Sequence, residues 1–143
     1  MLGLKGSYHG DTIGAMDACE GSIYNSTVES YSGRGIWFDP PTVAIRSGTV
    51  VTTVPWSRQN VGFPFVAELY NIPNQLSSPV ATEYRRHIHD KLDSLIQRDH
   101  FFGALVLEAL LMGAGGMIFV DPPLPGSPDI CRPISALLTP SDL

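Results

Sequence analysis

A chain of 143 residues that is 43% apolar is long enough to form one domain around a hydrophobic core. Its formal charge of −5, with only 9 lysines and arginines, argues against a nucleic-acid groove, because such a groove needs clustered positive charge. No apolar run reaches the roughly 18 residues of a membrane helix, and the start lacks the apolar core of a signal peptide. We therefore expect an intracellular protein with no nucleic-acid and no membrane partner, in which Cys19 and Cys131 are free thiols.

The N-terminal part of the chain predicts the end of a strand and one short helix. Residues 1–7 are typical of a strand that runs into a loop. Asp11 and Thr12 then offer an N-cap for a helix that ends near Ala18. The stretch 20–41 is rich in Gly, Ser and Tyr, and this composition predicts a loop.

A β-hairpin is predicted for residues 42–54, where two β-branched runs flank Ser47 and Gly48 as a two-residue turn. After the hairpin, residues 55–78 contain scattered Pro and Asn and show no clear period. We therefore expect this stretch to be a long connection between the hairpin and the next element.

The clearest predicted element is an amphipathic helix from about Pro79 to Arg98. Pro79 follows Ser78 and suits the first position of a helix. The residues that share its apolar face are Tyr84, Ile88, Leu92, Leu95 and Ile96. We expect this face to pack on a short parallel sheet.

The segment 103–108, "GALVLE", is apolar up to Glu108, which is typical of a strand buried on both faces of a parallel α/β sheet. Residues 113–116, "GAGG", then require a loop. The six prolines of 121–143 block regular helices and central strands. We expect one domain at 1–120, which the resemblance described below makes a partial one, and an irregular, disordered tail at 121–143.

Polar residues gather close to the N-terminus, where Ser7, His9 and Asp11 alternate and would face the same way on an extended segment. Three interpretations are open: a hydrolytic triad, a metal site that uses His9 and Asp11, and a polar turn capped by Asp11. A triad is disfavoured, because its members must meet at hydrogen-bond distance. A metal site is disfavoured because a third and a fourth ligand are not evident.

Glu108 is a second candidate, because a lone carboxylate at the end of a buried strand is costly unless it has a partner. The carboxyl ends of strands line the ligand crevice in α/β sheets. Glu108 is therefore either a site residue, with the glycine loop behind it, or a strand-end carboxylate in water, and the residues alone leave both readings open. The loop is not a dinucleotide fingerprint, because the G-x-G-x-x-G spacing is absent.

Two motifs resemble the class III, pyridoxal-5′-phosphate-dependent aminotransferases: "GSYHGDTIGAMDA" at 6–18 and "GALVLEALLMGAGGMIFVDP" at 103–122. Within that family they are most similar to the adenosylmethionine–8-amino-7-oxononanoate aminotransferases of biotin synthesis. The stretch "SGRGIWFDPPTV" at 32–43 is similar to the version that fungi and plants fuse to dethiobiotin synthetase. The resemblance covers residues 3 to about 122.

The resemblance implies an α/β fold: part of the large domain of a fold-type I pyridoxal-phosphate enzyme. That part would contain a short, mostly parallel sheet with flanking helices, an added β-hairpin and an irregular C-terminal tail. It implies pyridoxal 5′-phosphate as cofactor, a small-molecule substrate and a homodimeric parent enzyme. A mitochondrial location is compatible with a eukaryotic parent, although this chain shows no targeting segment.

The resemblance also implies roles for five residues, all of them cofactor-binding. Tyr8 matches the aromatic residue that stacks on the cofactor ring and touches the substrate. His9 and Gly10 match its neighbours in the turn, and Asp11 matches the polar residue behind it. Glu108 matches the strand-end carboxylate near the cofactor. A flat pyridinium ring needs an aromatic face and fixed polar neighbours, so the set is chemically coherent.

The sequence departs from the family pattern at several points. Ala109 stands where the family usually has Pro, and Met112 where it usually has Gln. Neither Lys5 nor Lys91 has the context of the Schiff-base lysine, and no segment matches the aspartate that pairs with the pyridine nitrogen. We expect a fragment that is inactive alone and has no catalytic residue of its own.

Other functions are open alternatives to this fragment. The chain could derive from another class III omega-aminotransferase, or be a non-enzymatic partner that docks on a full-length aminotransferase. It could also be a hydrolase built on Ser7, His9 and Asp11.

Overall fold

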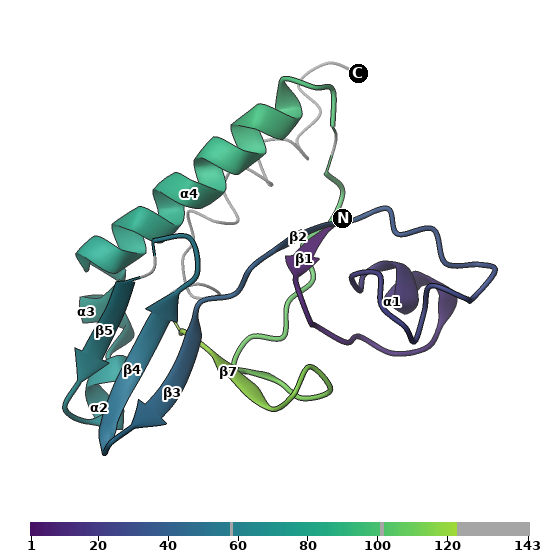
Figure 1. The fold of residues 1–143 in the computed structure, drawn as a ribbon. Helices are drawn as coiled ribbons and strands as arrows, with labels where there is room; N and C mark the ends of the chain where they lie inside the picture. The colour runs from purple at the N-terminus through teal and green to yellow at the C-terminus, as the bar shows by residue number, and fades with distance from the viewer. Residues whose placement is uncertain (58, 101, 123–143) are drawn as a thin grey trace.

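The computed structural model describes residues 1–57, 59–100 and 102–122 as a mixed α/β structure (Figure 1). Within these residues β1 and β2 form a parallel pair, and a second, antiparallel sheet has the strand order β5-β4-β3-β7-β6. The elements are β1 (Leu2–Leu4), α1 (Ile13–Asp17), β2 (Ile36–Phe38), β3 (Thr42–Arg46), β4 (Thr49–Val54), β5 (Gln59–Phe63), α2 (Val66–Leu69), α3 (Ile72–Leu76), α4 (Pro79–Ile96), β6 (Leu111–Met112) and β7 (Ile118–Val120).

The parallel sheet is smaller than the sequence predicts, and the larger sheet is antiparallel. Parallel pairing joins β1 to β2 and, through one bridge, Leu2 to Leu105. The bridge rests on two backbone hydrogen bonds, from Leu2 N to Ala104 O at 2.8 Å and from Val106 N to Leu2 O at 2.9 Å. The prediction of a strand at 103–108 is therefore wrong in extent, because the pairing is a single bridge. It is also wrong in burial, since Leu105 and Val106 are only partly buried. A continuous apolar run records hydrophobicity but does not say how many strands flank it.

The hairpin prediction is confirmed. β3 pairs with β4 around Ser47 and Gly48, which have φ values of 50° and 78°, as a tight turn between twisted antiparallel strands requires. The prediction of a long irregular connection at 55–78 is wrong. This stretch contains β5, which pairs with β4, and the short helices α2 and α3. A signal for β5 was present, since Val61 and Phe63 alternate with smaller or polar residues.

The predicted amphipathic helix is confirmed as α4. Ser78 caps it, because its side-chain oxygen accepts a hydrogen bond from Ala81 N at 3.1 Å, and Pro79 occupies the first turn. The apolar face is buried in a core whose fully buried members are Leu2, Leu4, Val54, Tyr84, Ile88, Leu92, Leu95, Phe102, Met112 and Val120. Among the helices of the described residues, even α4 has no apolar stretch that could cross a membrane.

α4 is tied to the rest of the chain by polar and aromatic contacts as well. The Tyr84 hydroxyl donates a hydrogen bond of 2.5 Å to Asp121 Oδ2, and both residues are buried. Trp56, which follows β4, stacks on His87 with ring centroids 4.2 Å apart and meets Tyr84 edge-on at 5.5 Å. Burial raises the pKa of Asp121 to about 6 and also raises the pKa of Tyr84.

The predicted tail at 121–143 is described only at its first two residues. Asp121 and Pro122 are buried, and Asp121 is bonded to α4, so the ordered part extends beyond residue 120. Residues 123–143, for which we expect disorder, lie outside the described residues. The division into 1–120 and 121–143 stays a prediction.

Replacing Leu92 with Ala should lower the free energy of unfolding by about 2–5 kcal/mol, because the side chain is 1% exposed and its removal leaves a cavity beneath α4. Urea unfolding followed by circular dichroism measures the change. Lys91→Ala, an exposed neighbour on the same helix, is the control and should stay within about 0.5 kcal/mol. A Leu92→Ala variant as stable as this control would contradict the packing of α4.

The buried Asp121 should make stability depend on pH. Its pKa rises from 3.8 in the unfolded chain to about 6 in the folded one, so the folded state binds the additional proton. The contribution of Asp121 to stability is therefore greatest below about pH 4, falls by up to roughly 3 kcal/mol as the pH rises through about 6, and is constant above about pH 7. Urea unfolding at several pH values should show this slope, and Asp121→Asn should remove it. Asp93→Asn, an exposed change on α4, should leave the slope unchanged.

Candidate functional site

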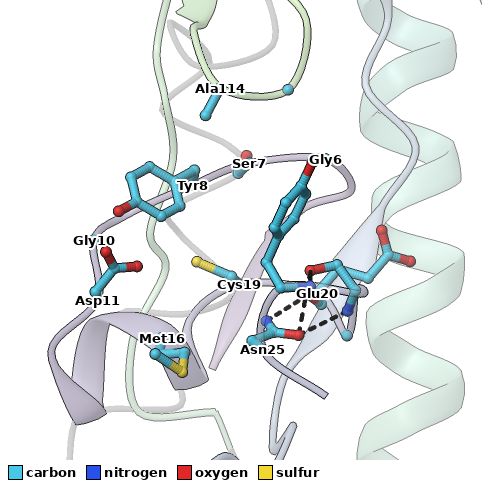
Figure 2. A pocket seen from close by; sticks show the side chains of 14 residues that line it. Gly6, Ser7, Tyr8, Gly10, Asp11, Met16, Cys19, Glu20, Asn25 and Ala114 are labelled. Carbon is cyan, nitrogen blue, oxygen red and sulfur yellow. Dashed lines mark hydrogen bonds between the residues drawn. The ribbon is translucent and has the colours of Figure 1, made fainter. Parts of the chain in front are cut away.

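A pocket of about 560 Å³ lies between the first motif and the glycine loop, within the size range of small-molecule sites (Figure 2). One side is formed by Tyr8, Gly10 and Asp11, which follow β1. Ala114 and Gly115 of the glycine loop also line it. The remaining side comes from α1 and the loop after it, represented by Met16, Cys19, Glu20 and Asn25.

Two glycines shape the turn that carries Tyr8. Gly6 and Gly10 have φ values of 76° and 113°, a region that side-chain-bearing residues rarely adopt. The chain then enters α1, whose first bond runs from Met16 N to Thr12 O at 2.8 Å. Thr12 stands at the predicted N-cap position, but its side chain makes no capping bond. The turn leaves the Tyr8 side chain 46% exposed over the pocket.

Glu108 joins the two motifs, and we call this arrangement the Glu108 bridge. Its Oε2 accepts a hydrogen bond from Tyr8 N at 2.9 Å, and its Oε1 accepts one from Gly113 N at 3.1 Å. Glu108 is therefore partly buried with two backbone partners, and its role as a site residue stays a prediction. Gly115 completes the junction, since a Cβ atom there would lie 2.3 Å from Gly6 O.

Asp11 acts on the ring of Tyr8. The side-chain hydrogen bond to Asp11, with partial burial and the charge of Asp11, raises the pKa of the Tyr8 phenol. Figure 2 shows the Asp11 carboxylate beside the Tyr8 ring, at the mouth of the turn. The phenol therefore stays neutral over the physiological pH range.

His9 is not among the residues that line the pocket. Its backbone N donates to Cys19 Sγ at 3.3 Å, which ties the turn to the residue that follows α1. Within the described residues its buried Nε2 has no hydrogen-bond partner. The cofactor contact expected for His9 stays a prediction.

The loop after α1 is held in place by a buried carboxylate. Asp17 Oδ1 accepts from Ser32 N at 2.8 Å, and Asp17 Oδ2 pairs with Arg34 at 3.2 Å. The Ser32 bond, followed by Arg34, lowers the pKa of Asp17 against the opposing effect of burial. The sequence predicted only a loop here, so Glu20 and Asn25 were missed as pocket residues. The Asn25 side chain makes local bonds, accepting from Ser22 N at 2.7 Å and donating to Glu20 O at 3.0 Å. The sequence alone does not place this turn against Tyr8.

The alternative sites find little support in the geometry. Ser7 is buried, and its Oγ donates to Met112 Sδ at 3.7 Å. In the described part of the chain no hydrogen bond joins Ser7, His9 and Asp11 to one another, so a hydrolytic triad is not assembled. Across residues 1–57, 59–100 and 102–122, no group of three or more His, Cys, Asp or Glu side chains could hold a metal ion.

The pocket matches one part of a pyridoxal-phosphate site and not the rest. Tyr8 offers an exposed aromatic face to a flat ring. No lysine lines the pocket, because Lys5 is paired with Asp39 at 2.9 Å and Lys91 lies on the exposed side of α4. The charged lining residues are Asp11 and Glu20, which would repel a phosphate. The residues present thus fit the ring of the cofactor but neither its phosphate nor its covalent attachment.

Loss of the Glu108 bridge should be visible at two amides. Glu108→Gln places a side-chain N–H against one of the two backbone donors, so one bond is lost, whereas Glu108→Ala loses both. We expect hydrogen exchange at Tyr8 N and Gly113 N to be faster in Glu108→Gln than in the unchanged chain, and fastest in Glu108→Ala. Glu108→Ala should also lower the free energy of unfolding by about 1–2 kcal/mol. Amide exchange followed by NMR measures both sites. Glu68→Gln on α2 is the exposed control, and unchanged exchange at both amides in Glu108→Ala would refute the bridge.

Comparison with known proteins gives relatives but no matching protein-family model. The chain is 43% identical over 128 residues to the bifunctional dethiobiotin synthetase/adenosylmethionine-8-amino-7-oxononanoate aminotransferase of Emericella nidulans. It is 35% and 34% identical to the mitochondrial bifunctional dethiobiotin synthetase/7,8-diamino-pelargonic acid aminotransferases of Oryza sativa subsp. japonica and Arabidopsis thaliana. Each match covers 85% of this chain and 16% of the relative.

These relatives confirm the resemblance carried by the two motifs around Tyr8 and Glu108. The chain spans 16% of the length of each relative, so it corresponds to one segment of a much longer protein. Its relatives are bifunctional dethiobiotin synthetase/aminotransferases, and the chain is similar to one segment of each of them.

Proposed function

We propose that this chain forms one side of the cofactor site of a class III, pyridoxal-phosphate-dependent aminotransferase, and that it does not transaminate alone. The observation that carries the proposal is the Glu108 bridge. It brings the Tyr8 turn and the glycine loop, 100 residues apart in sequence, to one pocket. These are the two motifs that resemble the family, so their meeting in space supports a shared role.

Each residue of the turn has a part in this proposal. Tyr8 holds the flat ring of the cofactor by stacking, and Asp11 orients the Tyr8 hydroxyl towards the substrate side. Gly10 gives the turn its left-handed backbone, and His9 fixes the turn to Cys19. Glu108 sets the height of Tyr8 relative to the glycine loop. The bound cofactor supplies an electron sink that stabilises negative charge on the substrate carbon next to the amino group.

The chain lacks the groups that would make this site complete. Covalent attachment of the cofactor needs a lysine amine at the pocket, and the same kind of amine moves the proton between substrate and cofactor carbons. Lys5 and Lys91 lie elsewhere. Stacking on one ring contributes roughly 1 kcal/mol beyond burial, whereas micromolar binding needs about 8 kcal/mol. Inactivity of the isolated chain follows from this difference.

The substrate class follows from the relatives' names. They support 8-amino-7-oxononanoate as amino acceptor, 7,8-diaminononanoate as product and adenosylmethionine as donor, in a protein of which this chain is a part. The names of the plant relatives also favour a mitochondrial location. Two candidates remain beside this one: another class III omega-aminotransferase, and a non-enzymatic partner of a full-length enzyme.

The isolated chain should show neither labelling nor turnover. After incubation with pyridoxal phosphate and borohydride, mass spectrometry should find no stoichiometric adduct at Lys5 or Lys91. The same protein should not transfer an amino group from adenosylmethionine to 8-amino-7-oxononanoate. The full-length Emericella nidulans relative is the positive control. A stoichiometric adduct at either lysine together with turnover would overturn the claim of inactivity.

A chimera tests the positive half of the proposal. The Emericella nidulans relative, with its matching segment replaced by this chain, should bind pyridoxal phosphate and transaminate. In the chimera Tyr8→Ala should weaken cofactor affinity about 2–10-fold, because the stacking ring is lost. Tyr8→Phe keeps the ring and should retain the affinity. An active chimera with the same cofactor affinity in Tyr8→Ala would refute the stacking role.

A further inference from the structure

One face of the antiparallel sheet is apolar and open to solvent where β3 meets β7. Val43 lies directly opposite Phe119, and Phe119 lies opposite Leu111 on β6, so the three side chains form one row across three strands. Ile45 is two residues further along β3 and shares that face. Continuing the register places Met117 beside Ile45. We call these five residues the open face.

The open face is the exposed part of a surface that is otherwise buried. Ile45 is 71% exposed, whereas Val50, its direct partner on β4, is 5% exposed. On β7, Phe119 is 49% exposed, while Val120 points the other way and is 1% exposed. On this face the burial of side chains therefore stops between β4 and β3, although the apolar pattern continues to β6. A contiguous apolar surface of this kind marks a contact with another polypeptide.

We propose that the open face is the docking surface for the rest of the aminotransferase polypeptide, so that this chain and the complementary part of such an enzyme associate without a covalent link. The inference rests on the proposed function. The relatives contain about six times the length of this chain, since each match covers 16% of them. Polypeptide of that kind is therefore available to cover the face. The occupant is expected to present an apolar surface, because the five side chains carry no charge.

A second copy of this chain is a poorer occupant. Each copy carries a formal charge of −5, which opposes self-association. The polypeptide that completes the enzyme is the better occupant, because in the relatives it is continuous with the segment that matches this chain. Burial of Phe119 and Ile45 against it would remove two large exposed side chains from water.

The test is co-expression of this chain with the Emericella nidulans relative from which the matching segment has been deleted. Size-exclusion chromatography with light scattering should show a 1:1 complex. Ile45→Thr and Phe119→Thr should each weaken association at least about tenfold, as truncation of central interface residues does. Ala44→Thr, on the same strand but on the opposite face, is the matched control and should bind normally. The intact relative should not bind, because its own segment already occupies the position.

The isolated chain gives a second, independent readout. If the open face is covered only in the complex, Ile45→Thr, at a side chain 71% exposed in the isolated chain, should leave its urea midpoint unchanged. A lowered midpoint would show that the face is already covered within the chain and would overturn the proposal. Absence of a complex, equal binding to the intact relative, or a homodimer that these variants dissociate would each overturn it as well. None of these measurements uses cofactor or turnover, so the outcome is separate from that of the proposed activity.

Discussion

The carboxylate of Glu108 is the contact on which the candidate site depends. Its two oxygens accept hydrogen bonds from Tyr8 N and Gly113 N, so one side chain fixes the relative height of two loops. Neither loop has much regular structure of its own to hold it there. α1 is 5 residues long and β6 only 2, and helices and strands this short depend on tertiary contacts. Without the bridge, the pocket would lose the contact that relates its two sides.

A second contact plays the corresponding part on the other side of the core. Tyr84 of α4 donates to Asp121 just after β7, and Trp56 packs between Tyr84 and His87. These contacts attach the long helix to the end of the antiparallel sheet through polar and aromatic groups in addition to aliphatic packing. Within the described residues Asp121 Oδ1 lacks a partner, and an unpaired buried oxygen favours the protonated carboxyl.

The elements that the sequence predicts well are those whose signal is local. α4 has a cap and a full apolar face, and the β3–β4 turn has a residue pair suited to positive φ, so both are readable without knowledge of their neighbours. The segment around Leu105 was misjudged because its burial depends on which strands lie beside it. β5 was missed because its alternation covers only five residues, Gln59–Phe63. For the site, resemblance drew attention to Tyr8 and Glu108 together, whereas the pocket positions of Glu20 and Asn25 depend on how the loop after α1 lies against the Tyr8 turn.

The close approach of Gly115 to Gly6 has a consequence for recombination between related genes. A side chain at position 115 would meet a backbone oxygen, which cannot rotate out of the way. The turn and the glycine loop must therefore change together, and neither can be replaced by a divergent counterpart while the other stays. In recombination between homologous genes, a crossover between these two positions would separate segments that are sterically matched. Recombinant genes that inherit both segments from one parent should be the ones that encode a folded protein.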